Sequence, residues 1–401
     1  MPRLYVNRKG FAHKRHSYSA GNTFDQSPFK YFLQKIEGWH ENDNKGTFLF
    51  GRAIEEAIQY HHDHNGEGAV EDFQARWNQH KENTKATYTK TEQNWENLYH
   101  IGTEMIKLYQ IRQPSLPIPL GGGVSFQREF AKEVFPGDPN YGEIEDCGKI
   151  DIIAYVDPEH PMLAKLDWRP EYGAVRPVIV DIKTSALDFP EQRGIAAFDK
   201  QLRRYSWLSG IRDVALLWFV KKNRAIQKGS SVTLLRDSDT FKAGEEAVVA
   251  KVDDAVVWLV RNDFMLDEME KAQGKKEDGK TDQTKAGKER AFQWLQMNGT
   301  PVASSDITKQ RLQFNSGFVT IESANEAGTI AARQIVQIVN AWKTYGTKPW
   351  PSEFGIRFPH DDRNDPFFRA FVLKDEGFKR DYFTRSEETV DDIFGEESEA
   401  E

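Results

Sequence analysis

The sequence predicts an α/β protein in which a mixed central sheet is flanked by helices. Strand-like segments gather in the middle of the chain, at 124–130, 148–156, 178–184 and 214–220, and another lies at 311–321. Helical patterns of apolar residues come before them, from 17 to about 110, and after them, from 322 to 343. These patterns differ because side chains repeat every two residues along a strand and about every 3.6 residues along a helix.

Composition limits the class of protein. The chain has 401 residues, of which 38% are hydrophobic and 29% charged, so it can bury a sizeable core. No segment approaches the roughly 18 apolar residues of a membrane-spanning helix, and the N-terminus lacks the apolar stretch of a secretory signal. We therefore expect a soluble, cytoplasmic protein without a membrane partner. The one cysteine, Cys147, excludes an internal disulfide and thiolate-based clusters.

The net charge of −8 neither supports nor excludes a nucleic-acid partner. Residues 386–401 hold eight acids and no base, so the rest of the chain is neutral overall. Residues 1–16 contain five basic residues and no acid. Local clustering, rather than the total, decides attraction to phosphates.

The chain divides into six predicted parts. Three of them lead into and form most of the sheet: a basic arm (1–16), a helical region (17–120) and a core (121–240). The core contains a helix at 191–210 that ends at Gly210, and the segment 231–235 is expected to pair with 214–220. The other three are a helical insertion (241–308) with a flexible charged segment (272–289), a strand and helices completing the core (309–385), and an acidic disordered tail (386–401).

Two acidic residues interrupt predicted buried strands. Asp151 lies in GKIDIIAYV, and Asp181 lies in VIVDIKT with Lys183 two residues later. An acid in such a strand is costly unless it is paired or binds a metal. Asp181 and Lys183 share a face, and the two acids converge if the strands are neighbours. Two carboxylates suit Mg²⁺ or Mn²⁺, and Lys183 could orient a nucleophile or stabilise charge. The alternative is a surface ion pair with Asp151 capping a turn.

The order of the motifs is more specific than any one of them. G-x-I-D at 148–151, D-I-K-T at 181–184 and Q-x-x-x-Y at 201–205 follow an N-terminal block at 17–39 and FGRAIEEAI at 50–58. This set resembles the PD-(D/E)XK nuclease superfamily, in particular its RecB/AddB-like branch. The resemblance covers most of residues 17–235 and, more loosely, 311–345. It implies a restriction-endonuclease-like core.

The resemblance also implies roles for individual residues. Asp151 and Asp181 would be metal ligands, the backbone carbonyl of Ile182 would complete the site, and Lys183 would be the catalytic lysine. Gln201 and Tyr205, four residues apart on one helical face, would contact DNA or hold the active-site water. Further basic residues would line a phosphate-binding groove, or form an ordinary solvated face: Arg203, Arg204, Lys221, Lys222 and Arg224.

The chain departs from the branch in two places. The branch commonly has a histidine four residues after the glycine of the N-terminal helix, where this chain has Glu55 after Gly51. Glutamate is an oxygen ligand, so we expect Glu55 to be a third metal ligand, with Glu56 as the competing candidate. Several relatives carry an iron–sulfur cluster that needs four cysteines. Here Ser27 stands before the proline, and we expect no cluster.

The expected function is that of a Mg²⁺-dependent deoxyribonuclease, more specifically an exonuclease in recombination, repair or DNA end-processing in a bacterium or its virus. An endonuclease remains open. The alternatives are a non-catalytic DNA-binding or assembly subunit that keeps the fold, and a structural protein of a larger assembly. No phosphate-binding loop of the G-x-x-x-x-G-K-[ST] type is present, so no nucleotide cofactor is expected. The acidic tail could dock a recombination or replication protein, or only increase solubility.

Overall fold

The structure is a computed structural model of the chain. It describes the following residues: 6–7, 10–11, 15–41, 44–83, 86–88, 94–139, 141, 144–163, 175–187, 194–222, 233–235, 247–253, 256–260, 263–276, 279–303, 308, 310–351 and 365–385. Arg224 and the acidic segment 386–401 lie outside these ranges, so the predictions made for them are not addressed by the structure.

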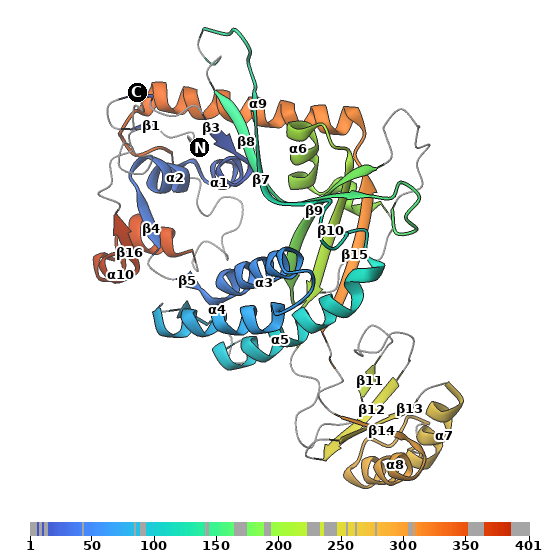
Figure 1. The fold of residues 1–401 in the computed structure, drawn as a ribbon. Helices are drawn as coiled ribbons and strands as arrows, with labels where there is room; N and C mark the ends of the chain where they lie inside the picture. The colour runs from blue at the N-terminus through green and yellow to red at the C-terminus, as the bar shows by residue number, and fades with distance from the viewer. Residues whose placement is uncertain are drawn as a thin grey trace.

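A mixed sheet of six strands forms the centre of the molecule, as the sequence predicted (Figure 1). The strand order is β15-β10-β9-β8-β3, and β7 also pairs with β8. β9 and β10 run parallel, as do β3 and β8, whereas β7/β8, β8/β9 and β10/β15 are antiparallel. The strands are β3 (Arg15–Ser17), β7 (Val124–Glu133), β8 (Glu145–Val156), β9 (Arg176–Ser185), β10 (Asp213–Val220) and β15 (Arg311–Phe318).

The parallel pair β9/β10 requires a crossover connection, and a helix supplies it. A short helical turn, η5 (Ile195–Phe198), precedes α6 (Lys200–Ser209). The expected helix at 191–210 therefore begins later than predicted, because Asp199 caps it by accepting from the N–H groups of residues 201 and 202. It ends as predicted at Gly210, whose φ of 77° suits a C-cap that only glycine adopts freely.

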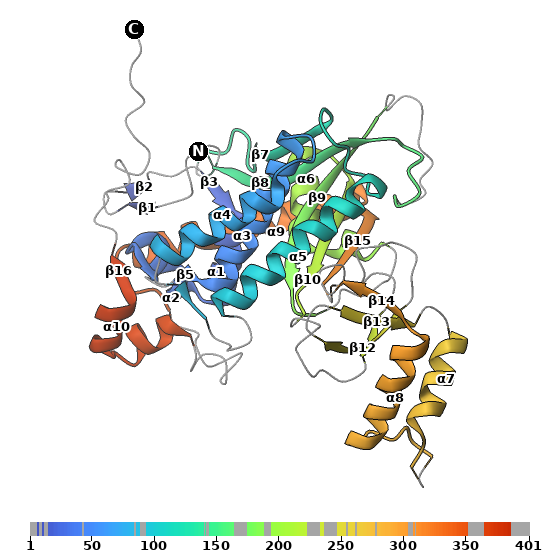
Figure 2. The ribbon, with the colours of Figure 1, turned by 60° about the horizontal axis from the view of Figure 1, so that its bottom comes forward.

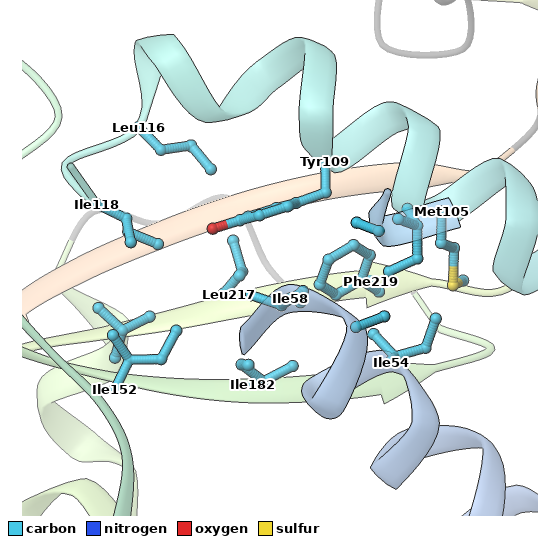
Figure 3. Packing of buried hydrophobic residues seen from close by; sticks show 14 of the residues in the cluster. Ile54, Ile58, Met105, Tyr109, Leu116, Ile118, Ile152, Ile182, Leu217 and Phe219 are labelled. Carbon is cyan, nitrogen blue, oxygen red and sulfur yellow. The ribbon is translucent and has the colours of Figure 1, made fainter. Parts of the chain in front are cut away.

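Helices cover both faces of the sheet (Figure 1). One face packs against α3 (Gly46–Asp63) and α5 (Trp95–Arg112), with α4 (Ala69–Asn83) outside them. Ile182 of β9 lies on this face beside Ile54 and Ile58 of α3 (Figure 3). The opposite face packs against α6 and the long helix α9 (Ile321–Tyr345), where the sequence predicted a helix. Because strand side chains alternate, Asp181 and Lys183 lie on the α6 face.

The first and last described segments pack together at one end of the sheet. The N-terminal block forms α1 (Tyr18–Gln26), α2 (Pro28–Tyr31), η1 (Phe32–Ile36) and β4 (Trp39–Glu41). The C-terminal segment forms η9 (Phe368–Val372), α10 (Glu376–Tyr382) and β16 (Phe383–Arg385), and β16 pairs with β4. An aromatic cluster fills the space between them; its buried members are Phe24, Tyr31, Phe32, Trp350, Phe367 and Phe383. The other short elements are β1 (Val6–Asn7), β2 (Gly10–Phe11), β5 (Asn44–Lys45), β6 (Ala86–Thr87) and η3 (Gln113–Ser115).

The insertion between β10 and β15 was predicted to be helical. It instead contains a four-stranded sheet together with two helices (Figures 1 and 2). Its strands are β11 (Thr233–Leu235), β12 (Ala247–Asp253), β13 (Val256–Val260) and β14 (Thr300–Ala303); its helices are α7 (Asp263–Gln273) and α8 (Lys285–Asn298). The sequences of β12 and β13 are rich in valine, which favours strands over helices. The predicted pairing of 231–235 with β10 is also wrong, since β11 pairs with β12.

The charged segment 272–289, predicted to be flexible, is hydrogen-bonded in its described residues. Between α7 and α8 the chain turns back on itself, with Asp282 N–H donating to the Gly274 carbonyl at 2.8 Å and Lys276 N–H donating to the Lys280 carbonyl at 2.8 Å. Arg290 also pairs with Asp282 at 2.9 Å. The charged composition predicts that the side chains of this segment are exposed. An ordered helical hairpin also exposes them, so the composition did not require a flexible segment. Among the described residues, none of the helices is long and apolar enough to cross a membrane.

Candidate metal-dependent active site

The structure brings Asp151 and Asp181 together where β8 and β9 separate. The last paired residues of these strands are Ile152 and Val180, so the two aspartates stand opposite each other one residue further on. Asp151 Oδ2 accepts a hydrogen bond of 3.0 Å from the Ile182 N–H, in place of a strand partner. The N–H and C=O of one strand residue point to the same side, so the Ile182 carbonyl is directed into the same gap. This is the position that the predicted carbonyl ligand requires.

Asp181 is a carboxylate without hydrogen bonds inside the protein. Its exposed fraction is 1%, and neither oxygen accepts a hydrogen bond. Lys183 Nζ lies 2.7 Å from Oδ2, close enough for an ion pair although the geometry is not that of a hydrogen bond. Burial raises the pKa of Asp181; Lys183 opposes this shift, and Asp151 adds to it. Such a group is stabilised most by a cation placed against its open oxygens.

A hydrogen-bonded chain leads from Lys183 into α6. Lys183 Nζ donates to Gln201 Oε1 at 3.1 Å, and Gln201 Nε2 donates to the Tyr205 hydroxyl at 2.7 Å. The Asp199 cap fixes the start of α6, so Gln201 in its first turn is aimed at Lys183. Gly148 gives Tyr205 its room, because a Cβ at this position would lie 2.7 Å from Tyr205 Cε1. The glycine of G-x-I-D is therefore required by the tyrosine of Q-x-x-x-Y.

Glu55, rather than Glu56, adjoins the two aspartates. Burial raises the pKa of Glu55 to about 8, and repulsion from Asp151 and then Asp181 adds to the shift. Glu56 also lines the adjoining pocket, but its carboxylate is held in ion pairs with Arg52 at 2.9 Å and Arg76 at 3.3 Å. Of the two candidates left open by the sequence, only Glu55 therefore faces the other carboxyl groups.

Glu55 and Lys183 line a pocket with a volume of about 920 Å³, whereas Asp151 and Asp181 contact two residues of its lining, Ile182 and Lys183. One wall is α3, including Phe48, Arg52 and Glu55, and the floor contains Ile182 and Lys183 of β9. Several pocket residues were not among the predicted site residues, including Phe48 and Arg52 of α3 and Gln127, Lys149 and Thr184 of the sheet. Lys149 could have been predicted as a site residue, because it lies two residues before Asp151 on the same strand. Gln127 could not, because its position opposite Asp151 depends on the β7/β8 register.

The predicted phosphate-binding residues differ in their surroundings. Lys221 lines the pocket, and Lys222 Nζ donates to the Ala186 carbonyl at 3.3 Å. Arg203 donates to the Ser323 carbonyl at 3.1 Å and pairs with Glu326 of α9. The prediction for Arg204 is contradicted.

Arg204 cannot reach a phosphate in this structure. Its exposed fraction is 3%, and its guanidinium pairs with the buried carboxylate of Asp146, with one hydrogen bond of 2.6 Å to Oδ2. A third hydrogen bond, of 3.2 Å, joins it to Gln334 of α9. Arg204 is a core residue that ties α6 to β8 and α9.

The acidic residues fit a divalent cation in their chemistry, although not as a finished coordination shell. Among the residues that the structure describes, no group of three or more histidine, cysteine or acidic side chains is arranged to hold a metal ion. However, Asp181 keeps two enclosed oxygens without hydrogen bonds, and Glu55, Asp151 and Asp181 repel one another. Carboxylate and carbonyl oxygens are the donors that Mg²⁺ and Mn²⁺ prefer, and a cation relieves this repulsion.

The raised pKa of Glu55 predicts a loss of stability with rising pH. The folded state holds this proton more tightly than the unfolded state, with a pKa of about 8 against an ordinary 4.5. Its contribution is therefore complete below pH 4.5 and disappears as the pH rises through about 8. Thermal unfolding in a chelator should show this loss, on the order of 2 kcal/mol, and excess Mg²⁺ should restore stability at the alkaline end. A Glu55→Gln variant with an unchanged pH dependence would contradict the assignment.

Replacement of Gln127 by glycine is expected to affect stability and activity in opposite directions. Gln127 has a φ of 52°, a left-handed conformation that costs a non-glycine residue about 1 kcal/mol, and it lies opposite Asp151, where the β7/β8 ladder lacks one residue pair although its register continues. Gln127→Gly should leave the melting temperature unchanged or higher, because glycine adopts this φ without strain. The same variant should lose activity, since it removes the amide that lines the pocket. Gln127→Ala, which keeps the strain and loses the amide, is the control.

Comparison with known proteins adds little. No protein-family model and no curated protein sequence matches the chain. One similar solved structure is that of SSO0001, which is 18% identical; the match covers 43% of this chain and 69% of SSO0001, with a TM-score of 0.17. Similarity at this level supports no argument about fold or function.

Proposed function

We propose that this chain is a metal-dependent deoxyribonuclease with a restriction-endonuclease-like core. One observation carries the proposal. Asp151 and Asp181, from two neighbouring strands, contact Ile182 and Lys183, which line one pocket, and Lys183 is joined to Gln201 and Tyr205 by hydrogen bonds. An ion pair that only stabilised the sheet would not require this chain of polar groups, nor leave the oxygens of Asp181 without hydrogen bonds.

Asp151, Asp181, Glu55 and the Ile182 carbonyl are the groups that would hold the ion. Bound Mg²⁺ or Mn²⁺ supplies a Lewis acid for the phosphate and lowers the pKa of a water molecule. The side chains of the protein would orient the substrate and neutralise its negative charge. Glu55 lines the pocket and Asp151 contacts its floor at Ile182, and Lys183 would add the positive charge that a phosphodiester requires in the transition state.

Lys183 is charged at the pH of the reaction. Burial favours the neutral amine, but the carboxylates of Asp181 and Asp151 outweigh it and raise the pKa of Lys183 above its ordinary value. A protonated lysine is a donor, so Lys183 in this state would stabilise negative charge or protonate a leaving oxygen. Gln201 holds the ammonium in place from the other side.

DNA is the substrate that the charge of the pocket favours. Arg52, Lys149, Lys183 and Lys221 line it beside the carboxyl groups. Phosphate neutralisation by such residues gives binding without sequence preference, as expected of a nuclease that degrades or trims ends. We extend the proposal to an exonuclease of recombination, repair or end-processing that works in the cytoplasm.

The test incubates the purified chain with linear and with circular DNA, in Mg²⁺, in Mn²⁺ and in a chelator. We expect degradation that requires the metal and prefers the linear form. Glu55→Gln should lower the rate by about 100-fold, because it removes one of the carboxylates that would hold the metal ion. Glu56→Gln, one residue along the same helix, should change the rate by less than about twofold, since exposed ion pairs contribute little.

Two outcomes would contradict the proposal. Equal loss in the two glutamine variants would mean that the helix, rather than the carboxylate of Glu55, matters. DNA binding without degradation under any metal would favour the alternative of a non-catalytic DNA-binding subunit that retains the fold.

A further inference from the structure

An exposed aromatic ring stands at the mouth of the pocket. Phe48, in the first turn of α3, has an exposed fraction of 72% and lines the pocket. Lys45 Nζ lies 5.9 Å from the centre of the ring, so a cation flanks it. Among the described residues, no other exposed large hydrophobic side chain lines this pocket.

Phe48 belongs to a stripe of pocket residues along α3. Phe48, Arg52, Glu55 and Gln59 are spaced by four, three and four residues, which places them on one face of the helix, and all four line the pocket. With a rise of about 1.5 Å per residue, Phe48 and Glu55 are separated by about 10 Å along the helix axis. That distance corresponds to about three stacked nucleotides at 3.4 Å each.

The residues of the stripe follow the order in which a single strand of DNA would present its phosphates and bases along α3. Glu55 lies with the acids that would act on the phosphodiester, Arg52 offers a cation to the next phosphates, and Phe48 offers an aromatic face beyond them. Arg52 is paired with Glu56 on the surface, an interaction weak enough to give way to phosphate. Lys149 and Lys221 supply positive charge in the same pocket.

The ring favours unpaired bases over a duplex. In a duplex the faces of the bases are covered by their neighbours, whereas every base of a single strand has a face open for stacking. A protein partner fits less well, because the ring is surrounded in the pocket by polar and charged side chains and not by an apolar patch.

We propose that Phe48 is a base-stacking residue that holds a single-stranded segment of DNA along α3, about three nucleotides from the bond to be hydrolysed. The proposal rests on the proposed function and deepens it by naming the form of the substrate. The enzyme then takes single-stranded DNA, or the unpaired end of a duplex, in preference to fully paired DNA.

The test measures binding in a chelator, so that the result is independent of hydrolysis. Fluorescence anisotropy follows a labelled oligothymidine and a labelled blunt hairpin duplex, each with the full chain. Phe48→Ala should weaken binding of the single strand by about 5-fold to 100-fold, the range seen for loss of one stacked base. Binding of the duplex should change by less than about twofold, because its bases do not reach the ring.

Matched variants separate stacking from other causes. Phe48→Trp should bind the single strand as tightly as the unaltered chain or more tightly, and Phe48→Leu should resemble Phe48→Ala because it keeps apolarity without an aromatic face. Phe264→Ala is the control: this phenylalanine of α7 is 73% exposed and does not line the pocket, and its loss should leave both affinities unchanged.

Unchanged binding of oligothymidine to Phe48→Ala would overturn the proposal, as would an equal loss for the single strand and the duplex. Either result leaves metal-dependent degradation by the unaltered chain intact, so the nuclease proposal would survive. Conversely, a chain that binds the single strand through Phe48 but degrades no DNA would contradict the nuclease proposal and retain the stacking site.

Discussion

Asp181→Asn should lower DNA hydrolysis by at least about 1000-fold while the protein stays folded. The carboxylate is lost at the point where Lys183 is paired and where the cation would be held, so neither would be positioned for the reaction. Stability should change little near neutral pH. The substitution removes the cost of burying the charge of Asp181, but it also removes the ion pair with Lys183.

The matched control is another buried aspartate of the same sheet. Asp213, at the start of β10, pairs with the buried guanidinium of Arg176, with one hydrogen bond of 2.8 Å. Asp213→Asn should destabilise the protein but keep its activity per folded molecule, which is the opposite pattern. Thermal unfolding and nuclease rates of both variants decide the matter. An Asp181→Asn protein that degrades DNA at the normal rate would refute the assignment of the active site.

Arg204→Ala should lower the free energy of unfolding by about 3–5 kcal/mol, the largest stability effect that we expect from a single substitution. Arg204 pairs with Asp146, and both side chains are buried. Truncation leaves the carboxylate of Asp146 charged and unpaired in the core. It also removes the hydrogen bond to Gln334, which holds α9 against α6.

Its neighbour provides the comparison. Arg203, one residue earlier on α6, pairs with the exposed Glu326, and Arg203→Ala should cost less than about 1 kcal/mol. The double variant Arg204→Met with Asp146→Leu should be more stable than Arg204→Ala, because it leaves no buried charge unpaired. Urea unfolding curves test all three. A cost below about 1 kcal/mol for Arg204→Ala would show that Asp146 finds another partner or is protonated.

A comparison of the candidate site residues with Arg204 shows which features of the structure could be predicted from the sequence. Asp151 and Asp181 could be identified because each interrupts an apolar strand, which is a local pattern. Gln201 and Tyr205 could be joined because residues four apart share a helical face. The role of Arg204 could not be read in this way, since its partner Asp146 lies 58 residues away on β8. An arginine next to another arginine on a helix suggests a basic surface unless the long-range partner is known.

The insertion was misjudged for a similar reason. Valine-rich segments such as β12 (AVVAKVD) have few residues, and apolar runs of this length do not distinguish strands from helices by periodicity alone. Their β-branched composition was the better guide. The central sheet was easier to predict, because longer apolar strands alternate with clear turns.

The N-terminal block and the C-terminal segment lie against each other. Ser27 caps α2 by accepting a hydrogen bond from the Lys30 N–H. Tyr31 of α2 stacks on Trp350 with ring centres 5.7 Å apart, and β4 pairs with β16. Aromatic packing and a strand pair therefore connect the same regions.

The insertion leaves the sheet after Val220 and returns at Arg311, and these two residues are direct partners in the β10/β15 ladder. To the core, a connection of about 90 residues is therefore equivalent to the turn of a hairpin, and the entropy of closing a loop grows only slowly with its length. Glu55, Asp151, Asp181 and Lys183 of the proposed site all precede this point in the chain. The insertion could therefore be gained, exchanged or lost as one unit without changing the strands that carry these residues.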